Sequence, residues 1–221
     1  MSGTLSQPQG GMLEVVLRLL HADAPEQIMG TPQDWPRWAV LLPHVLAATS
    51  HFNMLPDQAL RAAGTDASWL LDRAATYLQV QAGLAEARPL AERALAIDEA
   101  VYGPEHPAMA TGLNNLAFIL RDLGKPGEAR PLAERALTIA EGSYGPEHPA
   151  VATVLGNFAF ILRDLGKPGE ARPLAERALT IAEAAYGPDH LEVANRMNNL
   201  AIILHDLGQQ GFVKVGVAVR D

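Results

Sequence analysis

Apolar residues recur at helical spacing in two consecutive segments near the middle of the chain. Residues 107–123 place their apolar side chains on one helical face, and Gly124 follows as a helix-ending glycine. Residues 126–143 form a second apolar face with the same spacing. The pattern predicts two helices that pack together through these faces. The residues on them are Leu113, Leu116, Ala117, Leu120 and Leu123, then Ala129, Leu132, Ala133, Ala136, Leu137 and Ala140.

This pair of segments recurs with a period of 42 residues. YGPEHPA begins at Tyr102 and at Tyr144, and YGPDH begins at Tyr186. Between 102–143 and 144–185, 36 of 42 positions are identical, which indicates a recent duplication, and a degenerate earlier copy covers about 66–101. Because such periods are typical of stacked helical repeats, we predict an array of about 3.5 units over residues 66–207.

Both ends of the chain depart from the period. Residues 1–65 contain two short amphipathic segments, 13–20 and 38–48, and predict an irregular helical leader. After Gly208 the expected second helix is replaced by valines at alternating positions, so residues 208–221 are predicted to be a divergent tail. The last repeat would then lack a partner helix, and its apolar face would be partly uncovered.

The segments LNNLAFILRDLGKPGEARPLAERAL and YGPEHP resemble the tetratricopeptide repeat, in the 42-residue form found in kinesin light chain. The resemblance covers about residues 66–208. It implies an all-α fold, a right-handed solenoid of antiparallel helix pairs, in which the first helix of each pair lines a concave surface. It also implies a non-enzymatic scaffold that binds a peptide or a partner domain on that surface.

The leader carries a second resemblance. DWPRWAVLLPHVLAATSH, followed by LLDRAATYLQVQAGLAEARPLAERALAI, is similar to the stretch that joins the nucleotide-binding core to the repeats in bacterial NB-ARC ATPases of the STAND class. It implies an alternative function as the sensor arm or a fragment of such an ATPase. The Gly-Lys pairs at 124–125 and 166–167 are followed by proline, so neither forms a phosphate-binding P-loop. A third alternative is a structural module that self-associates through its uncapped last repeat.

Composition narrows the choice of partners. The chain has 17 Lys+Arg against 25 Asp+Glu, a net charge of −8, and no basic cluster, which argues against nucleic acid as a partner. It has no cysteine, which excludes disulfides and thiol catalysis and fits a cytoplasmic location. Its apolar runs are broken by charges every few residues, so no membrane partner is expected.

Histidine is the one residue type that suggests a metal site. His106, His148 and His190 recur beside acidic residues, but positions one period apart lie roughly 10 Å from each other on packed helices and cannot share one ion. We interpret them as turn histidines that precede a new helix. Because the chain also lacks a recognisable catalytic motif, we predict neither enzymatic activity nor a cofactor or metal.

Asparagines beside the core leucines of the first helices are the best candidate binding residues. A carboxamide offers a donor and an acceptor, which suits either a structural link between helices or the backbone of an extended peptide. Arg121 and Arg163 could select acidic side chains of such a peptide, unless Asp122 and Asp164 neutralise them. By resemblance, the predicted peptide-binding residues are Asn114, Asn115, Phe118, Arg121, Asn157, Phe160, Arg163, Asn198, Asn199 and His205.

Overall fold

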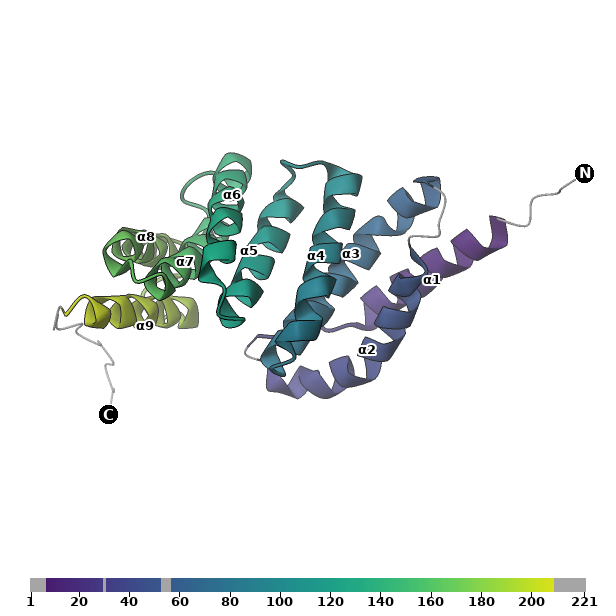
Figure 1. Cartoon of the computed structure of the whole chain (residues 1–221), viewed down its shortest axis with the longest axis horizontal. Helices are drawn as coiled ribbons and strands as arrows, with labels where there is room; N and C mark the ends of the chain where they lie inside the picture. The colour runs from purple at the N-terminus through teal and green to yellow at the C-terminus, as the bar shows by residue number, and fades with distance from the viewer. Residues whose placement is uncertain (1–6, 30, 53–56, 209–221) are drawn as a thin grey trace, which may run out of the picture. The chain divides into compact units, whose positions relative to one another are not determined.

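The regular structure of the chain consists of helices. The computed structural model describes residues 7–29, 31–52 and 57–208, and these ranges contain no strand (Figure 1). The all-α prediction is confirmed. The helices are α1 (Gln7–Asp23), α2 (Trp35–Ser50), α3 (Asp57–Val80), α4 (Leu84–Tyr102), α5 (Pro107–Asp122), α6 (Pro126–Tyr144), α7 (Pro149–Asp164), α8 (Pro168–Tyr186) and α9 (Leu191–Asp206), with a short 3-10 turn at Pro32–Asp34.

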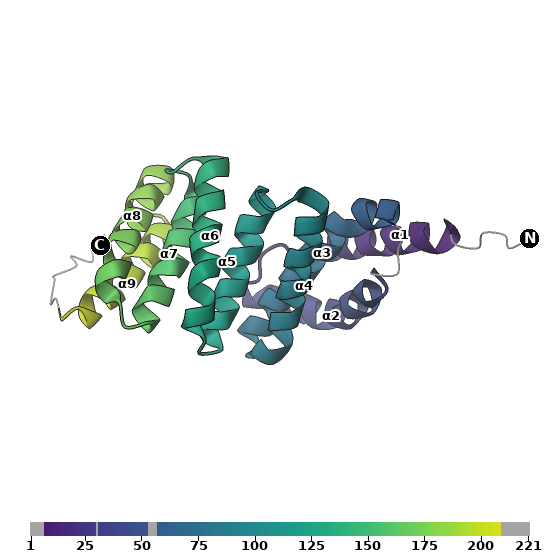
Figure 2. The same cartoon turned by 45° about the horizontal axis from the view of Figure 1, so that its top comes forward.

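The chain divides into two compact units, residues 1–125 and 126–221. In the first unit α3 packs against α1, α2 and α4, and α4 packs against α5 (Figure 1). In the second unit α6, α7, α8 and α9 pack consecutively, and α7 also touches α9 (Figure 2). Since α7 and α9 are the first helices of two successive repeats, their equivalent residues lie on neighbouring helices.

The recurring YGP(E/D)H segment is the turn that starts the repeats at Tyr102, Tyr144 and Tyr186. Its glycines close the preceding helix at positive φ, which is 87° at Gly103, 86° at Gly145 and 82° at Gly187, a conformation that glycine adopts at little cost. The histidine that follows caps the new helix: in the second copy, the backbone N–H of Ala150 donates to Nδ1 of His148 at 3.1 Å. The tyrosine that opens the segment stacks on this ring. The interpretation of the histidines as turn residues is confirmed.

The first repeat begins without such a turn. Helix α3 starts at Asp57 and continues through position 65, where the leader was predicted to end. Thr65 stands where the later repeats have Pro107 and Pro149, and Ala62 stands where they have Pro104 and Pro146. Because no proline interrupts the hydrogen-bonding pattern at this point, the helix extends upstream. The predicted leader and the first repeat therefore share one helix.

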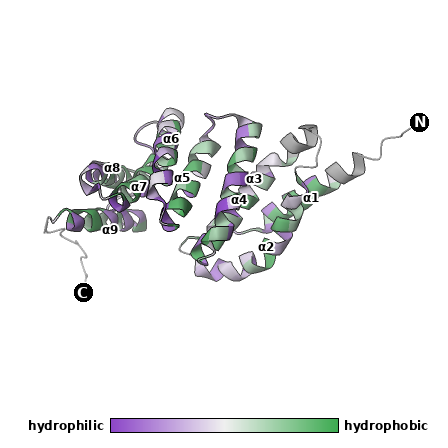
Figure 3. Cartoon of the chain, viewed as in Figure 1, coloured by the Kyte–Doolittle hydropathy of each residue, from purple (hydrophilic) through white to green (hydrophobic). Residues whose placement is uncertain are grey.

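The leader packs into the core of the first repeat. Leu17 of α1, Trp38 of α2 and Leu70 of α3 are fully buried in one cluster. The indole of Trp38 donates to the backbone oxygen of Pro25 at 3.1 Å, which satisfies its polar atom. Colouring by hydropathy shows hydrophobic and hydrophilic residues on the same helices, as stacking through one face requires (Figure 3).

Helix α9 is less covered than its counterparts. Met197, Leu200 and Leu204 are half-buried, whereas Leu155 and Leu162, one period before Met197 and Leu204, are buried. Except for Gly208, the segment predicted to be a divergent tail lies outside the described residues.

The capping role of the turn histidines predicts a specific loss of stability. We expect His148→Ala to lower the free energy of unfolding by about 1 kcal/mol, and His148→Asn to retain most of it, because asparagine also caps helices. Urea denaturation followed by circular dichroism measures both values. Glu147→Ala, at the exposed neighbouring position, is the control, and an equal loss in that variant would contradict the assignment.

Candidate interaction surface

A carboxamide recurs on the first helices at one position of the repeat. Asn115, Asn157 and Asn199 are separated by 42 residues each, and all three are half-buried. Asn198 is exposed, and one period earlier its place is taken by Gly156. Asn114 is only 7% exposed. In the first unit a ligand would therefore reach Asn115 rather than Asn114, and in the second unit the accessible carboxamides at this position are Asn157 and Asn199.

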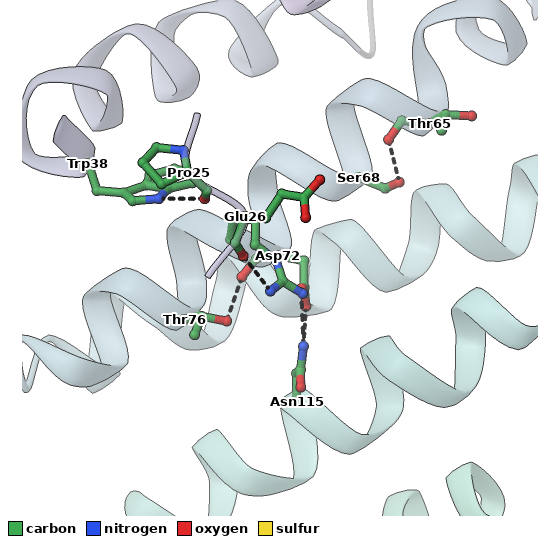
Figure 4. Close-up of polar contacts among 9 residues, drawn as sticks. Pro25, Glu26, Trp38, Thr65, Ser68, Asp72, Thr76 and Asn115 are labelled. Carbon is green, nitrogen blue, oxygen red and sulfur yellow. Dashed lines mark hydrogen bonds and ion pairs between the residues drawn. The ribbon is translucent and has the colours of Figure 1, made fainter. Parts of the chain in front are cut away.

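In the first unit this carboxamide joins two helices. The side-chain nitrogen of Asn115 lies 2.9 and 3.0 Å from the two carboxylate oxygens of Asp72, so that α5 is linked to α3 (Figure 4). Asp72 is 8% exposed and also accepts a hydrogen bond from Arg73 at 2.9 Å. The charge of Asp72 is thus compensated where it is buried. Asn115 has a structural role here, and its carboxamide oxygen is a further acceptor.

The arginines predicted to select acidic ligands already face carboxylates of the chain. The guanidinium of Arg163 donates to Asp206 through Nε and lies 3.5 Å from Asp164 through Nη1. The guanidinium of Arg121 lies 3.6 Å from Asp122. The hydrogen bond from Arg163 lowers the pKa of the Asp206 carboxyl. An acidic ligand at Arg163 would compete with these internal partners.

The remaining predicted residues lie on the same helices as the carboxamides. Phe118 and Phe160 are half-buried, and the guanidinium carbon of Arg121 lies 4.9 Å from the centre of the Phe118 ring. The side chain of His205 is 90% exposed and lies 3.5 Å from Asp206. Phe160, Arg163 and His205 thus accompany Asn157 and Asn199 on α7 and α9, and Phe118 and Arg121 accompany Asn115 on α5.

Sequence reasoning missed a second group of polar residues in the degenerate first repeat. Asp98 of α4 stands where Ala140 and Ala182 stand in the later copies. Burial raises the pKa of its carboxyl, although a hydrogen bond from Ser68 acts in the opposite direction. The signal in the sequence was this departure from the repeat, since a charge at a position that is otherwise alanine needs a local reason.

The described residues contain neither a metal site nor a membrane-spanning helix. Among them, no three histidine or acidic side chains are placed to hold a metal ion. No helix in the same ranges is long and apolar enough to cross a bilayer.

Comparison with known proteins identifies the family. The sequence model described as "Tetratricopeptide repeat" matches three overlapping stretches, residues 65–141, 108–184 and 151–211, which together cover more than half of the chain. The chain belongs to the tetratricopeptide repeat family. The right-handed solenoid of antiparallel helix pairs that was predicted is the fold of this family. No curated protein matches the sequence.

Solved structures show the same fold at low sequence identity. BtubC (BKLC) from P. vanneervenii is 19% identical with a TM-score of 0.62, and the match covers 94% of this chain and 86% of that one. A kinesin light chain candidate from Podosopora anserina with nearly identical TPR-like repeats is 18% identical with a TM-score of 0.66, over 92% and 90% of the two chains. The prediction of kinesin light chain-like repeats is thereby supported at the level of the fold.

The pair between Arg163 and Asp206 predicts a change in titration. We expect Arg163→Ala to raise the pKa of Asp206 toward its ordinary value, because the donor that stabilises the carboxylate is removed. In the wild type this pair stabilises the fold at neutral pH, and the contribution is lost as the pH falls through the folded-state pKa of Asp206. Carbon-detected NMR titration of the carboxyl measures the shift. Arg130→Ala, which removes a cation paired with Glu134 on α6, should leave the Asp206 titration unchanged.

The raised pKa of Asp98 predicts the opposite dependence on pH. Protonation favours the folded state at this site, so the contribution of Asp98 to stability falls as the pH rises through its titration range. We therefore expect Asp98→Asn to have a higher free energy of unfolding than the wild type at neutral pH, and the difference to shrink in acid. Urea denaturation at several pH values tests this. Glu105→Gln removes an exposed charge from the adjacent turn and should show no such trend.

Proposed function

We propose that the chain is a non-enzymatic scaffold that binds an extended segment of a partner protein along the first helices of its repeats. The observation that carries the proposal is the pair of half-buried carboxamides at Asn157 and Asn199, which stand at equivalent positions of two successive repeats in the second unit. Membership of the tetratricopeptide repeat family supports a protein-interaction role. In such arrays the first helices line the concave surface.

The geometry of the second unit suits an extended peptide. Asn157 and Asn199 stand at equivalent positions of α7 and α9, which touch. Packed helices have axes roughly 8–10 Å apart, and an extended chain advances about 3.3 Å per residue. Successive carboxamides would therefore meet backbone groups about three residues apart. Because each carboxamide can donate and accept, this contact does not depend on the ligand's side chains.

Ligand charge is a separate part of the proposal. Arg121 and Arg163 could contact acidic side chains of a ligand, but Arg163 would have to exchange Asp206 for the incoming carboxylate. Such an exchange replaces one ion pair by another and yields little net free energy at an exposed site. We therefore assign affinity mainly to the carboxamides, and we expect removal of both arginines to alter the salt dependence of binding only weakly.

Two further proposals rest on the ends of the chain. The leader and the first repeat share one hydrophobic core, which includes Leu17, Trp38 and Leu70. In a STAND-class ATPase such a core would join the repeats of the sensor arm rigidly to the leader. A P-loop domain encoded on the same gene or beside it would support that role.

The half-buried apolar residues of α9 favour self-association, which sedimentation analysis would detect. The cytoplasmic location stays a prediction.

Selection from a library of random peptides displayed on phage tests the main proposal. Peptides captured by the full chain would be synthesised and their affinities measured by isothermal titration calorimetry. We expect the double variant Asn157→Ala/Asn199→Ala to bind about tenfold more weakly or worse, because each lost hydrogen bond contributes about 1 kcal/mol.

A matched double variant on a second helix is the control. Arg130→Ala/Glu134→Ala removes an ion pair from α6 and leaves the first helices intact, so its affinity should equal that of the wild type. Circular dichroism checks that both variants fold. Unchanged affinity after loss of the two asparagines, with a folded protein, would move the binding site off the first helices.

A further inference from the structure

The degenerate first repeat contains a pocket of about 210 Å³ between α3, α4 and α5. A space of about 10–15 Å³ in the same measure holds one water molecule, so the pocket can accommodate a group of side-chain size. Trp69, Asp72 and Arg73 line it from α3, Asp98 and Tyr102 line it from α4, and Gly112 lines it from α5.

The equivalent place between α7, α8 and α9 is filled by an arginine of the chain itself. Arg196 stands two periods after Gly112, and its side chain is only 11% exposed. Its guanidinium lies 3.3 Å from the hydroxyl of Thr153 and 3.1 Å from the carboxylate of Glu192. A Cβ placed on Gly156 would lie 2.7 Å from its Nη1.

These three neighbours of Arg196 map onto the wall of the empty pocket. Two periods earlier, Thr153 corresponds to Trp69, Glu192 to Ala108 and Gly156 to Asp72, and all three earlier residues line the pocket. The fold of the repeat thus places the guanidinium of Arg196 in this space between α7, α8 and α9. In the other copy, Gly112 supplies no side chain and the space stays open.

The charges of the pocket favour a cation. Oδ2 of Asp72 lies 2.9 Å from Nη2 of Arg73, so the charges of these two side chains compensate each other. Asp98 is half-buried and lines the pocket, and no lysine or arginine in the described ranges forms an ion pair with it. A carboxylate in partly buried surroundings gains from a charged partner more than one in water does.

The aromatic wall favours a planar cation over a compact one. The ring of Trp69 is stacked on His21 of α1 with centroids 4.1 Å apart, and the guanidinium carbon of Arg73 lies 5.9 Å from the centre of the same ring. His21 in turn pairs with Asp66. The hydroxyl of Tyr102 is hydrogen-bonded to Thr65, which joins α4 to α3 beside the pocket. Both rings are held in place before any ligand arrives. The position of Arg73 over the Trp69 ring indicates that this wall accommodates a guanidinium, and a guanidinium pairs with a carboxylate through its edge, which an ammonium group cannot do equally well.

We propose that the pocket between α3, α4 and α5 binds the guanidinium of an arginine side chain from the partner protein, with Asp98 as its counter-ion and with Trp69 and Tyr102 in the pocket wall. This inference rests on the proposed function, because it names one side chain of the bound segment. It goes further than that function because it assigns an arginine of the partner to the pocket of the first repeat.

The test uses a small probe, so that it does not depend on identifying the partner. N-acetyl-arginine methylamide is titrated into the full chain, and the indole N–H signals of its three tryptophans are followed by proton–nitrogen NMR. Trp69→Phe assigns the Trp69 signal. We expect this signal to shift saturably, with a dissociation constant on the order of millimolar for so small a ligand. The citrulline analogue, which has the same shape and no charge, should cause no saturable shift.

Variants separate the pocket from general effects of charge. Asp98→Asn keeps the shape of the side chain and should weaken binding of the probe at least about tenfold. Gly112→Arg copies the arrangement of Arg196 and should prevent binding by filling the pocket from within. Glu105→Gln removes one exposed acidic charge near the pocket and should bind the probe as the wild type does.

Two results would overturn the inference: equal responses to the arginine and citrulline probes, or unchanged probe binding by Asp98→Asn. Failure of the probe leaves the peptide selection at Asn157 and Asn199 unaffected, since those residues lie in the other compact unit. Conversely, a probe that binds while no peptide is selected would support the pocket and contradict the proposed scaffold function.

Discussion

The structure depends on the close packing of alanine-rich second helices against the first helices of the repeats. In α8 the side chains of Ala171, Ala175 and Ala178 are buried, and α8 contacts both α7 and α9. Small side chains let neighbouring helices approach closely, and a single helix pair has too little apolar surface to stay folded alone. Stability is therefore shared between successive repeats, which leaves the polar faces of the helices available for other roles.

Polar residues on the first helices form contacts within the array in the absence of a ligand. Asn115 reaches back to Asp72, and Arg163 reaches forward to Asp206, so that side chains one repeat apart are tied together. A carboxamide has an acceptor as well as donors, so the oxygen of Asn115 can accept a hydrogen bond while its nitrogen donates to Asp72. A bound segment would use a surface that is already ordered, and less conformational entropy would be lost on binding.

Substitutions at equivalent positions make the repeats differ from one another while the helix pairs stay the same. Position 112 and its two equivalents are Gly112, Val154 and Arg196. The glycine opens a pocket in the first repeat, the valine is buried, and the arginine lies against Gly156. The same helical backbone carries all three residues, and the position is buried in the first two copies and largely buried in the third. One duplicated unit can thus acquire a binding pocket without loss of its fold.

The sequence alone determined the helices, their period and the family, because apolar spacing and the proline and glycine turns act locally. The start of α3 could not be predicted, since the continuation of a helix through Thr65 depends on packing against the leader as well as on the absence of proline. The accessible asparagine also needed the tertiary structure, which buries Asn114 and leaves Asn115 half-buried. Only the folded chain brought Asp98, Trp69 and Gly112 to one pocket, because they come from three helices whose relative positions are set by long-range packing.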